Sequence, residues 1–87
     1  MGKYWLEFKN SVAKDLRALP KKDVARLLKQ IRLLSEEPRP QGCEKLSGQD
    51  RYRIRQGEYR IIYEIHGDAL IVILVKIGHR RDVYRTT

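Results

Sequence analysis

Three consecutive strand-like segments in the second half of the chain constrain its fold more than any other feature. Residues 51–55 alternate strictly between polar and apolar side chains, residues 58–65 alternate as well, and residues 69–77 are almost entirely apolar. Alternation is typical of a strand with one buried face, whereas a short apolar run favours a strand buried on both faces. Gln56-Gly57 and Gly67-Asp68 are compatible with tight hairpin turns. The pattern therefore predicts three strands joined by two hairpins.

The first half of the chain predicts one strand and two helices. Residues 3–8 fit a short strand, after which Asn10 or Ser11 can cap a helix. Pro20 suits the start of a second helix, and residues 35–42 end that helix in a loop. Each helix has an apolar stripe at helical spacing, formed by Val12, Ala13, Leu16 and Leu19 in the first and by Val24, Leu27, Leu28, Ile31 and Leu34 in the second. The predicted order is β-α-α-β-β-β in a single α+β domain over residues 1–87.

The positive charge of the chain indicates a polyanionic partner. Lys and Arg number 19 against 11 Asp and Glu, which gives a formal net charge of +8. A charge of this sign favours nucleic acid, acidic proteins or anionic membranes, although a merely basic protein without such a partner is the alternative. The second helix leaves the same choice open, because its basic face either contacts RNA or a partner or is simply solvated; this face consists of Lys22, Arg26, Lys29 and Arg32.

Cysteine usage and hydropathy favour the cytoplasm. Cys43 is the only cysteine, so no disulfide forms within the chain, which fits a reducing compartment. The first residues lack the apolar stretch of a signal peptide, and the longest apolar run, residues 69–75, is far too short to span a bilayer. His66 and His79 are the only histidines and lack the spacing of metal ligands. We therefore expect neither a metal site nor a cofactor.

An arginine-rich hairpin is the strongest candidate for a binding site. If Gln56-Gly57 forms a two-residue loop, Arg53 faces Arg60 across the hairpin and Arg55 faces Glu58. Two directly opposed arginines repel each other unless water, an acid or a bound anion compensates. Guanidinium groups hold phosphate oxygens bidentately and stay charged. The hairpin therefore predicts a phosphate cradle made of Arg51, Arg53, Arg55 and Arg60.

The same pairing rule, applied to the second hairpin, brings a histidine to this cradle. With Gly67-Asp68 as the second two-residue loop, Arg60 faces Val75, and the same face runs through Ile77 to His79. A bulge in either hairpin would reverse this assignment.

Metal-free RNA cleavage requires three groups that this chain could supply. A base must take the proton of the ribose 2′-hydroxyl, cations must stabilise the phosphorane, and an acid must protonate the leaving 5′-oxygen. Glu44 can serve as the base, and His79 can serve as acid or base. The charge can come from Arg53, Arg55, Arg60 and Arg80, with Tyr84 to stack or orient and with Arg51 and Arg81 as further contacts to RNA. Each of three residues also has an ordinary structural interpretation. Glu44 could be a surface carboxylate, His79 a turn residue, and Tyr84 a side chain that covers the end of the sheet.

The pattern Tyr-Arg-Ile-Arg and then Tyr-Arg-Ile-Ile-Tyr, with Gly-His-Arg-Arg and Val-Tyr further along, resembles the RelE/ParE toxin superfamily over roughly residues 4–85. The first part of this pattern lies in residues 52–65, which follow Leu46-Ser47-Gly48. The second part lies in residues 75–84, and the opening Lys14-Asp15-Leu16 is similar as well. The resemblance implies an antiparallel sheet with a helical hairpin packed on one side.

The function implied by this resemblance depends on the branch of the superfamily. In the RelE branch, it implies an endoribonuclease, or mRNA interferase, that cuts mRNA in the ribosomal A site by 2′-hydroxyl attack and is blocked by a cognate antitoxin. In the ParE branch, the same fold poisons DNA gyrase and lacks the RNA-cutting residues. A non-catalytic basic RNA-binding domain is a third hypothesis. We expect an antitoxin to be acidic and to cover the face that carries Arg53 and Arg60.

The resemblance extends to individual site residues. Three positions match the RelE pattern, namely Arg60, Arg80 and Tyr84, whereas Arg53 and Arg55 stand where that pattern has two lysines. An arginine is a poor general base because it keeps its proton. Glu44 and His79 instead resemble a glutamate and a histidine that other relatives use. The implied mechanism assigns proton transfer to Glu44 or His79, charge stabilisation to the arginines and orientation to Tyr84.

Overall fold

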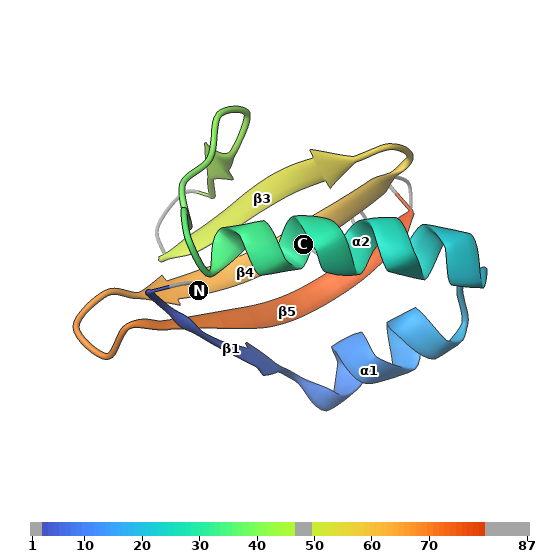
Figure 1. The fold of residues 1–87 in the computed structure, drawn as a ribbon, viewed down its shortest axis with the longest axis horizontal. Helices are drawn as coiled ribbons and strands as arrows, with labels where there is room; N and C mark the ends of the chain where they lie inside the picture. Colours follow the sequence, from blue (N-terminus) through green and yellow to red (C-terminus); the bar gives the residue numbers. More distant parts are fainter. Residues whose placement is uncertain (1–2, 47–49, 80–87) are drawn as a thin grey trace.

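A mixed β-sheet with two helices forms the part of the chain that this computed structural model describes, residues 3–46 and 50–79 (Figure 1). The elements in chain order are β1 (Trp5–Phe8), α1 (Asn10–Arg17), α2 (Lys21–Leu34), β2 (Glu44–Lys45), β3 (Arg51–Gln56), β4 (Tyr59–His66) and β5 (Ile71–His79). The predicted α+β class is confirmed, and the two-residue β2 is an addition to the predicted order. Neither helix in this part of the chain is long and apolar enough to cross a membrane.

The five strands follow the order β1-β5-β4-β3-β2 across the sheet. β1 runs parallel to β5, with Trp5 opposite Ile71 and Phe8 opposite Leu74. The remaining pairs, β5–β4, β4–β3 and β3–β2, are antiparallel as predicted. The sheet is therefore mixed, because the β1–β5 pair is parallel and the other three pairs are antiparallel.

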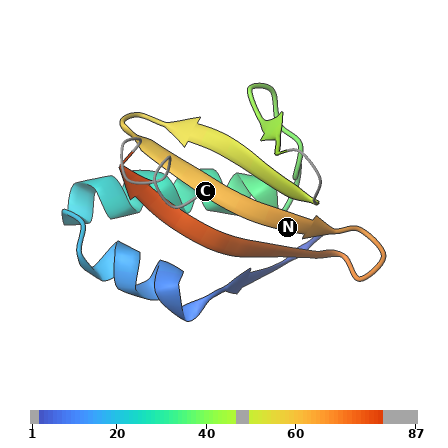
Figure 2. The ribbon, with the colours of Figure 1, turned by 180° about the vertical axis from the view of Figure 1, so that it is seen from behind.

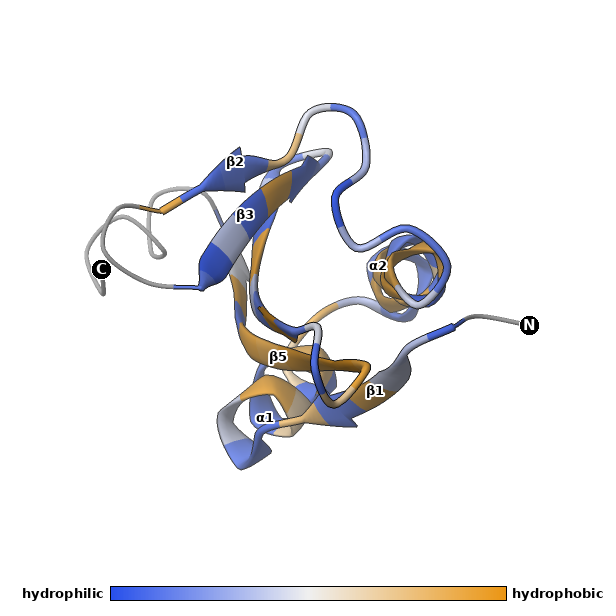
Figure 3. Ribbon diagram, turned by 90° about the vertical axis from the view of Figure 1, so that its left-hand side faces the viewer, coloured by the Kyte–Doolittle hydropathy of each residue, from blue (hydrophilic) through white to orange (hydrophobic). Residues whose placement is uncertain are grey.

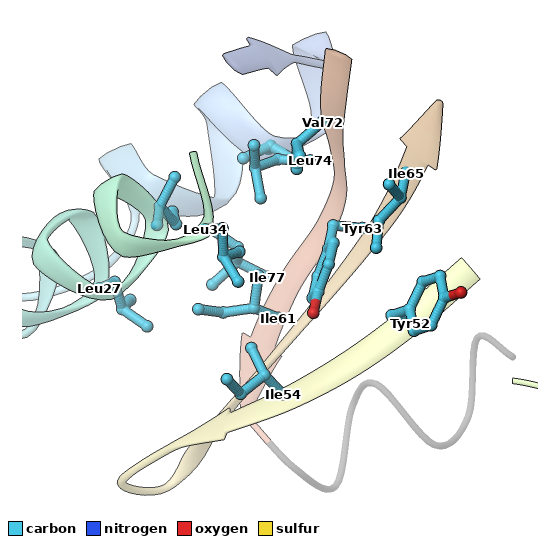
Figure 4. Packing of buried hydrophobic residues seen from close by; sticks show 12 residues of the cluster. Leu27, Leu34, Tyr52, Ile54, Ile61, Tyr63, Ile65, Val72, Leu74 and Ile77 are labelled. Atoms are coloured by element: carbon cyan, nitrogen blue, oxygen red, sulfur yellow. The ribbon is translucent and has the colours of Figure 1, made fainter. Parts of the chain in front are cut away.

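The helix α2 covers one face of the sheet and leaves the other face without a helix (Figures 2 and 3). Its stripe of buried side chains packs into one cluster with the strands, as Figure 4 shows for Leu27, Leu34, Ile54, Ile61, Tyr63 and Ile77. The prediction that the last strand is buried on both faces is wrong, because Val72 and Leu74 are buried whereas Ile71 and Ile73 are only half-buried. We call the face opposite α2 the open face.

The β3–β4 hairpin has a different register from the predicted one. Its turn is Gly57-Glu58, so that Arg55 pairs with Arg60 and Arg53 pairs with Ile62. The predicted pairing of Arg53 with Arg60 is therefore wrong by two residues. Gly57 has a φ of +60°, a conformation that suits a glycine at the first central position of a type II′ hairpin turn.

The β4–β5 hairpin also departs from its predicted pairing. Its turn spans residues 67–70, and the register shifts between Ile62, which pairs with Lys76, and Tyr63, which pairs with Leu74. Val75 is the extra residue of this bulge, and it reverses the alternation of all later residues of β5. Arg60 consequently faces Gly78 rather than Val75.

The helix α1 protects the edge of β5 beyond the end of β1. Ser11 Oγ donates a hydrogen bond to the carbonyl of Val75 at 3.2 Å, so Ser11 is not the helix cap that the sequence predicts, and no side chain caps α1. Asp15 Oδ2 accepts from the amide of Ile77 at 3.2 Å, and Asp15 Oδ1 accepts from Lys76 Nζ at 3.2 Å. These side chains occupy strand-edge groups that would otherwise be open to another strand.

Replacement of Asp15 should therefore destabilise the fold. Asp15→Ala leaves the Ile77 amide and the Lys76 ammonium without their carboxylate, and we expect the free energy of unfolding to fall by about 1–3 kcal/mol. Urea unfolding measures the change, with the exposed neighbour Lys14→Ala as the control. Equal stability of the two variants would contradict this role of Asp15.

Candidate functional site

Four of the predicted site residues meet at one place on the open face, which we call the arginine cradle: Glu44, Arg53, Arg55 and Arg60. Glu44 on β2 pairs with Arg53 on β3, and Arg55 on β3 pairs with Arg60 on β4. Because directly paired residues point to the same face, all four side chains belong to the same side of the sheet. A hollow of about 370 Å³ adjoins these residues at the edge of β3 and extends to α2, since Gln30 and Ile54 help to line it. Its full lining is Gln30, Gln41, Gly42, Glu44, Arg53, Ile54, Arg55 and Arg60.

The cradle combines one accessible carboxylate with guanidinium groups of different burial. Arg53 Nη2 donates to Glu44 Oε2 at 2.9 Å, and the Glu44 side chain is 65% exposed. Arg55 is exposed, whereas Arg60 is only 4% exposed. A charge in a poorly solvated position acts more strongly on a neighbouring anion than a charge in bulk water does. The cradle can therefore hold a phosphate group and present a carboxylate beside it.

The loop between α2 and β2 sets the position of Glu44. The buried Tyr63 hydroxyl donates to the carbonyl of Pro38 at 2.7 Å, and its burial raises the pKa of this phenol. Arg39 Nε donates to the Tyr52 hydroxyl at 3.2 Å, with its guanidinium carbon 5.3 Å from the centre of the same ring. Sequence reasoning did not identify these contacts, since they join residues 13 and 25 positions apart in the chain.

Arg51 lies one step further along β3, on the same face. Its Nε donates to Glu64 Oε2 at 2.9 Å, and Glu64 Oε1 lies 3.0 Å from His66 Nε2. The hydrogen bond to His66 is the main cause of a lowered pKa for Glu64, and Arg51 acts in the same direction. Arg51 was predicted to contact RNA, and here its guanidinium already has a carboxylate partner.

His79 does not lie in the arginine cradle, so its predicted place there is wrong. The bulge at Val75 turns His79 to the face covered by α2, where it pairs with Tyr59. The two rings meet edge to face with centroids 6.3 Å apart, and His79 Nε2 lies 3.8 Å from Glu58 Oε2. A second hollow of about 360 Å³ surrounds them, which we call the turn hollow; it is lined by Asp23, Arg26, Gln56, Gly57, Glu58, Tyr59 and His79.

The remaining predicted site residues, Arg80, Arg81 and Tyr84, lie outside the described residues. Within residues 3–46 and 50–79, no group of three or more His, Cys, Asp or Glu side chains is arranged to hold a metal ion. The chemistry of the described site therefore rests on one carboxylate and three guanidinium groups.

The chain is similar to known toxins of type II toxin–antitoxin systems in both sequence and fold. Residues 6–84 match the family described as the ParE toxin of type II toxin–antitoxin systems, parDE. The RelE1 protein of Methanocaldococcus jannaschii is 32% identical over 87 residues, with coverage of 95% of this chain and 97% of that protein. Toxin RelG of Mycobacterium tuberculosis is 30% identical over 86 residues, with coverage of 94% and 97%. A chain of the archaeal RelE–RelB complex from Pyrococcus horikoshii superposes with a TM-score of 0.81 at 32% identity, covering 90% of this chain and 96% of that chain.

The lowered pKa of Glu64 makes one contribution to stability dependent on pH. Because the pKa is lower in the folded chain than its ordinary value of 4.5, the carboxylate stabilises the fold above that pH, and the stabilisation is lost as the pH falls below it. Glu64→Gln should lower the free energy of unfolding at pH 7 and weaken its decline between about pH 5 and pH 3. Urea unfolding across this range is the measurement, with the exposed Glu7→Gln as the control. An acid decline as steep in Glu64→Gln as in the parent would refute the assignment.

Proposed function

This chain belongs to the RelE/ParE family of toxins of type II toxin–antitoxin systems, and on that premise we propose that it is an endoribonuclease that cuts mRNA in the ribosomal A site. The observation that carries the proposal is the arginine cradle. There, the Glu44 carboxylate is 2.9 Å from the Arg53 guanidinium, beside the directly opposed Arg55 and Arg60.

Glu44 is the general base of the proposed reaction. Its exposed carboxylate takes the proton of a ribose 2′-hydroxyl, and the 2′-oxygen then attacks the adjacent phosphorus to form a cyclic phosphate. Arg53 keeps the carboxylate oriented through its 2.9 Å hydrogen bond. The arginines of this chain cannot replace the family's lysines as a base, since a guanidinium does not lose its proton at neutral pH.

Arg55 and Arg60 stabilise the negative charge that builds up on the phosphorane. The two residues are directly paired across β3 and β4, so a phosphate between their guanidinium groups accepts hydrogen bonds from both. Fixed charges of this kind supply the electrostatic role of a metal ion, so the proposed cleavage needs none. The leaving 5′-oxygen takes its proton from water at the open hollow, because His79 lies on the other face.

The alternative function is inhibition of DNA gyrase, and the family description in terms of a ParE toxin is the observation that favours it. A gyrase inhibitor needs no base beside the cradle, so the two functions differ in their dependence on Glu44. RNA cleavage remains the better supported function, because Arg60 matches an arginine of the RelE pattern and the Glu44 carboxylate belongs to the same cradle.

Substitution of Glu44 or Arg55 should abolish most of the cleavage. Loss of a general base costs about 10²–10⁴ in rate, and loss of one charge donor costs about 10²–10³. We expect discrete new 5′ ends on translated mRNA after a short pulse of the parent protein, and at least about 10²-fold fewer with Glu44→Gln or Arg55→Ala. Primer extension is the measurement.

The matched control is Arg32→Ala, an exposed arginine on α2 that does not line the cradle. It should cleave like the parent, and thermal unfolding should show that all variants fold. Intact mRNA together with continued growth arrest would contradict the nuclease proposal and favour inhibition of DNA gyrase instead.

We further propose that a cognate acidic antitoxin neutralises the toxin by covering the open face at the arginine cradle. The net charge of +8 and the clustered guanidinium groups favour an acidic partner. Solved relatives include RelE in complex with RelB, as in the complex from Pyrococcus horikoshii.

A charge reversal in the cradle should weaken this complex. Arg55→Glu places a carboxylate against the acidic partner, and we expect its Kd to rise about tenfold or more, whereas Arg32→Glu should change it less than about threefold. Isothermal titration with the purified antitoxin measures both values. Equal affinities of the two variants would argue against a cradle-blocking antitoxin.

A further inference from the structure

The turn hollow contains a set of preoriented polar and aromatic groups that the proposed cleavage does not use. Tyr59 OH donates to Asp23 Oδ2 at 2.8 Å, a bond that raises the pKa of the phenol and joins β4 to α2. The rings of Tyr59 and His79 meet edge to face, with an angle of 78° between their planes. Gln56 and Arg26 complete the wall with an amide and a guanidinium.

The turn hollow lies directly beyond the end of the arginine cradle. Arg55 and Gln56 are consecutive in β3, and Tyr59 and Arg60 are consecutive in β4. Since successive strand residues point to opposite faces, each strand contributes one side chain to the cradle and the next to the turn hollow. The cradle and the turn hollow therefore lie on opposite sides of the same end of the β3–β4 hairpin.

The charges of the turn hollow differ from those of the cradle. Arg26 is accompanied by the carboxylates of Asp23 and Glu58, so the hollow has no excess of positive charge to attract a phosphate. It offers donors and acceptors together with two aromatic rings, which are the groups that bind the edges and faces of single-stranded RNA bases. Its volume of about 360 Å³ suits a small planar ligand.

We propose that the turn hollow is a nucleobase pocket, which receives a base of the RNA strand whose phosphate lies in the arginine cradle. This inference rests on the proposed function, since it takes RNA as the substrate. Tyr59 and His79 contact the base with their rings, while Gln56, Arg26 and Asp23 read its polar edge. The pocket therefore sets a base preference near the cleaved bond.

The two histidines of the chain provide a direct test of binding in the pocket. His79 lines the turn hollow, and His66 stands at the far end of β4 as an internal reference. The probe is a short 2′-O-methyl oligonucleotide, which cannot be cleaved because it lacks the attacking hydroxyl. Titration should shift the imidazole proton resonance of His79, as assigned with a His66→Gln variant. An unmoved His79 resonance at saturating oligonucleotide would overturn the proposal.

A double variant separates base recognition from catalysis. Arg26→Ala with Gln56→Ala should bind the oligonucleotide about tenfold more weakly, because contacts to one base contribute that much affinity or more. Cleavage by this double variant should show a flatter base preference at the cut sites than cleavage by the parent. Arg32→Ala, the same residue type on the same helix outside the hollow, is the control.

The outcomes also separate this proposal from the nuclease proposal. Oligonucleotide binding with a shifted His79 resonance, but without cleavage by the parent protein, would support the pocket and reject the nuclease. An unchanged base preference and affinity in the double variant would overturn the pocket and leave the nuclease standing. Weaker antitoxin binding with unchanged RNA binding would assign the turn hollow to the antitoxin instead, and would also overturn the pocket.

Discussion

The packing of α2 against a single face of the sheet is the constraint on which the rest of the structure depends. Leu27, Ile31 and Leu34 are fully buried against strand residues that include Ile61 and Tyr63. Each such side chain contributes roughly 1.5–3 kcal/mol when it leaves water, so a slip of one residue in β3 or β4 would lose most of the core. Because side chains alternate along a strand, the same packing directs the intervening arginines to the open face.

The core and the site are connected through Tyr63. Its ring belongs to the buried cluster, while its hydroxyl holds the carbonyl of Pro38 in the loop that leads to β2. Arg39 adds a second attachment through Tyr52. Glu44 thus reaches Arg53 from a strand of only two residues, because core side chains rather than a long strand ladder hold the preceding loop.

The two faces of the sheet carry different chemistry around one turn. The open face has guanidinium groups on neighbouring strands, which suits the phosphate of the proposed substrate, and the covered face has a hollow of mixed charge with two aromatic rings. In the proposed mechanism, Arg53 and Arg55, which stand where the RelE pattern has two lysines, supply positive charge but cannot transfer a proton. The base must then come from another element, and Glu44 on β2 is the carboxylate within reach of Arg53.

The sequence by itself determined the α+β class, the hairpin-rich second half and the membership of the toxin family, since hydrophobic periodicity and the Tyr-Arg-Ile motifs are local properties. Tertiary structure decided which arginines oppose each other and on which face His79 lies. A turn moved by one residue or a bulge at Val75 changes little locally, and neither has a clear signal in the residues around it. Both were fixed by the burial of Ile61, Tyr63 and Leu74 under α2 and by the α1 side chains that hold the edge of β5.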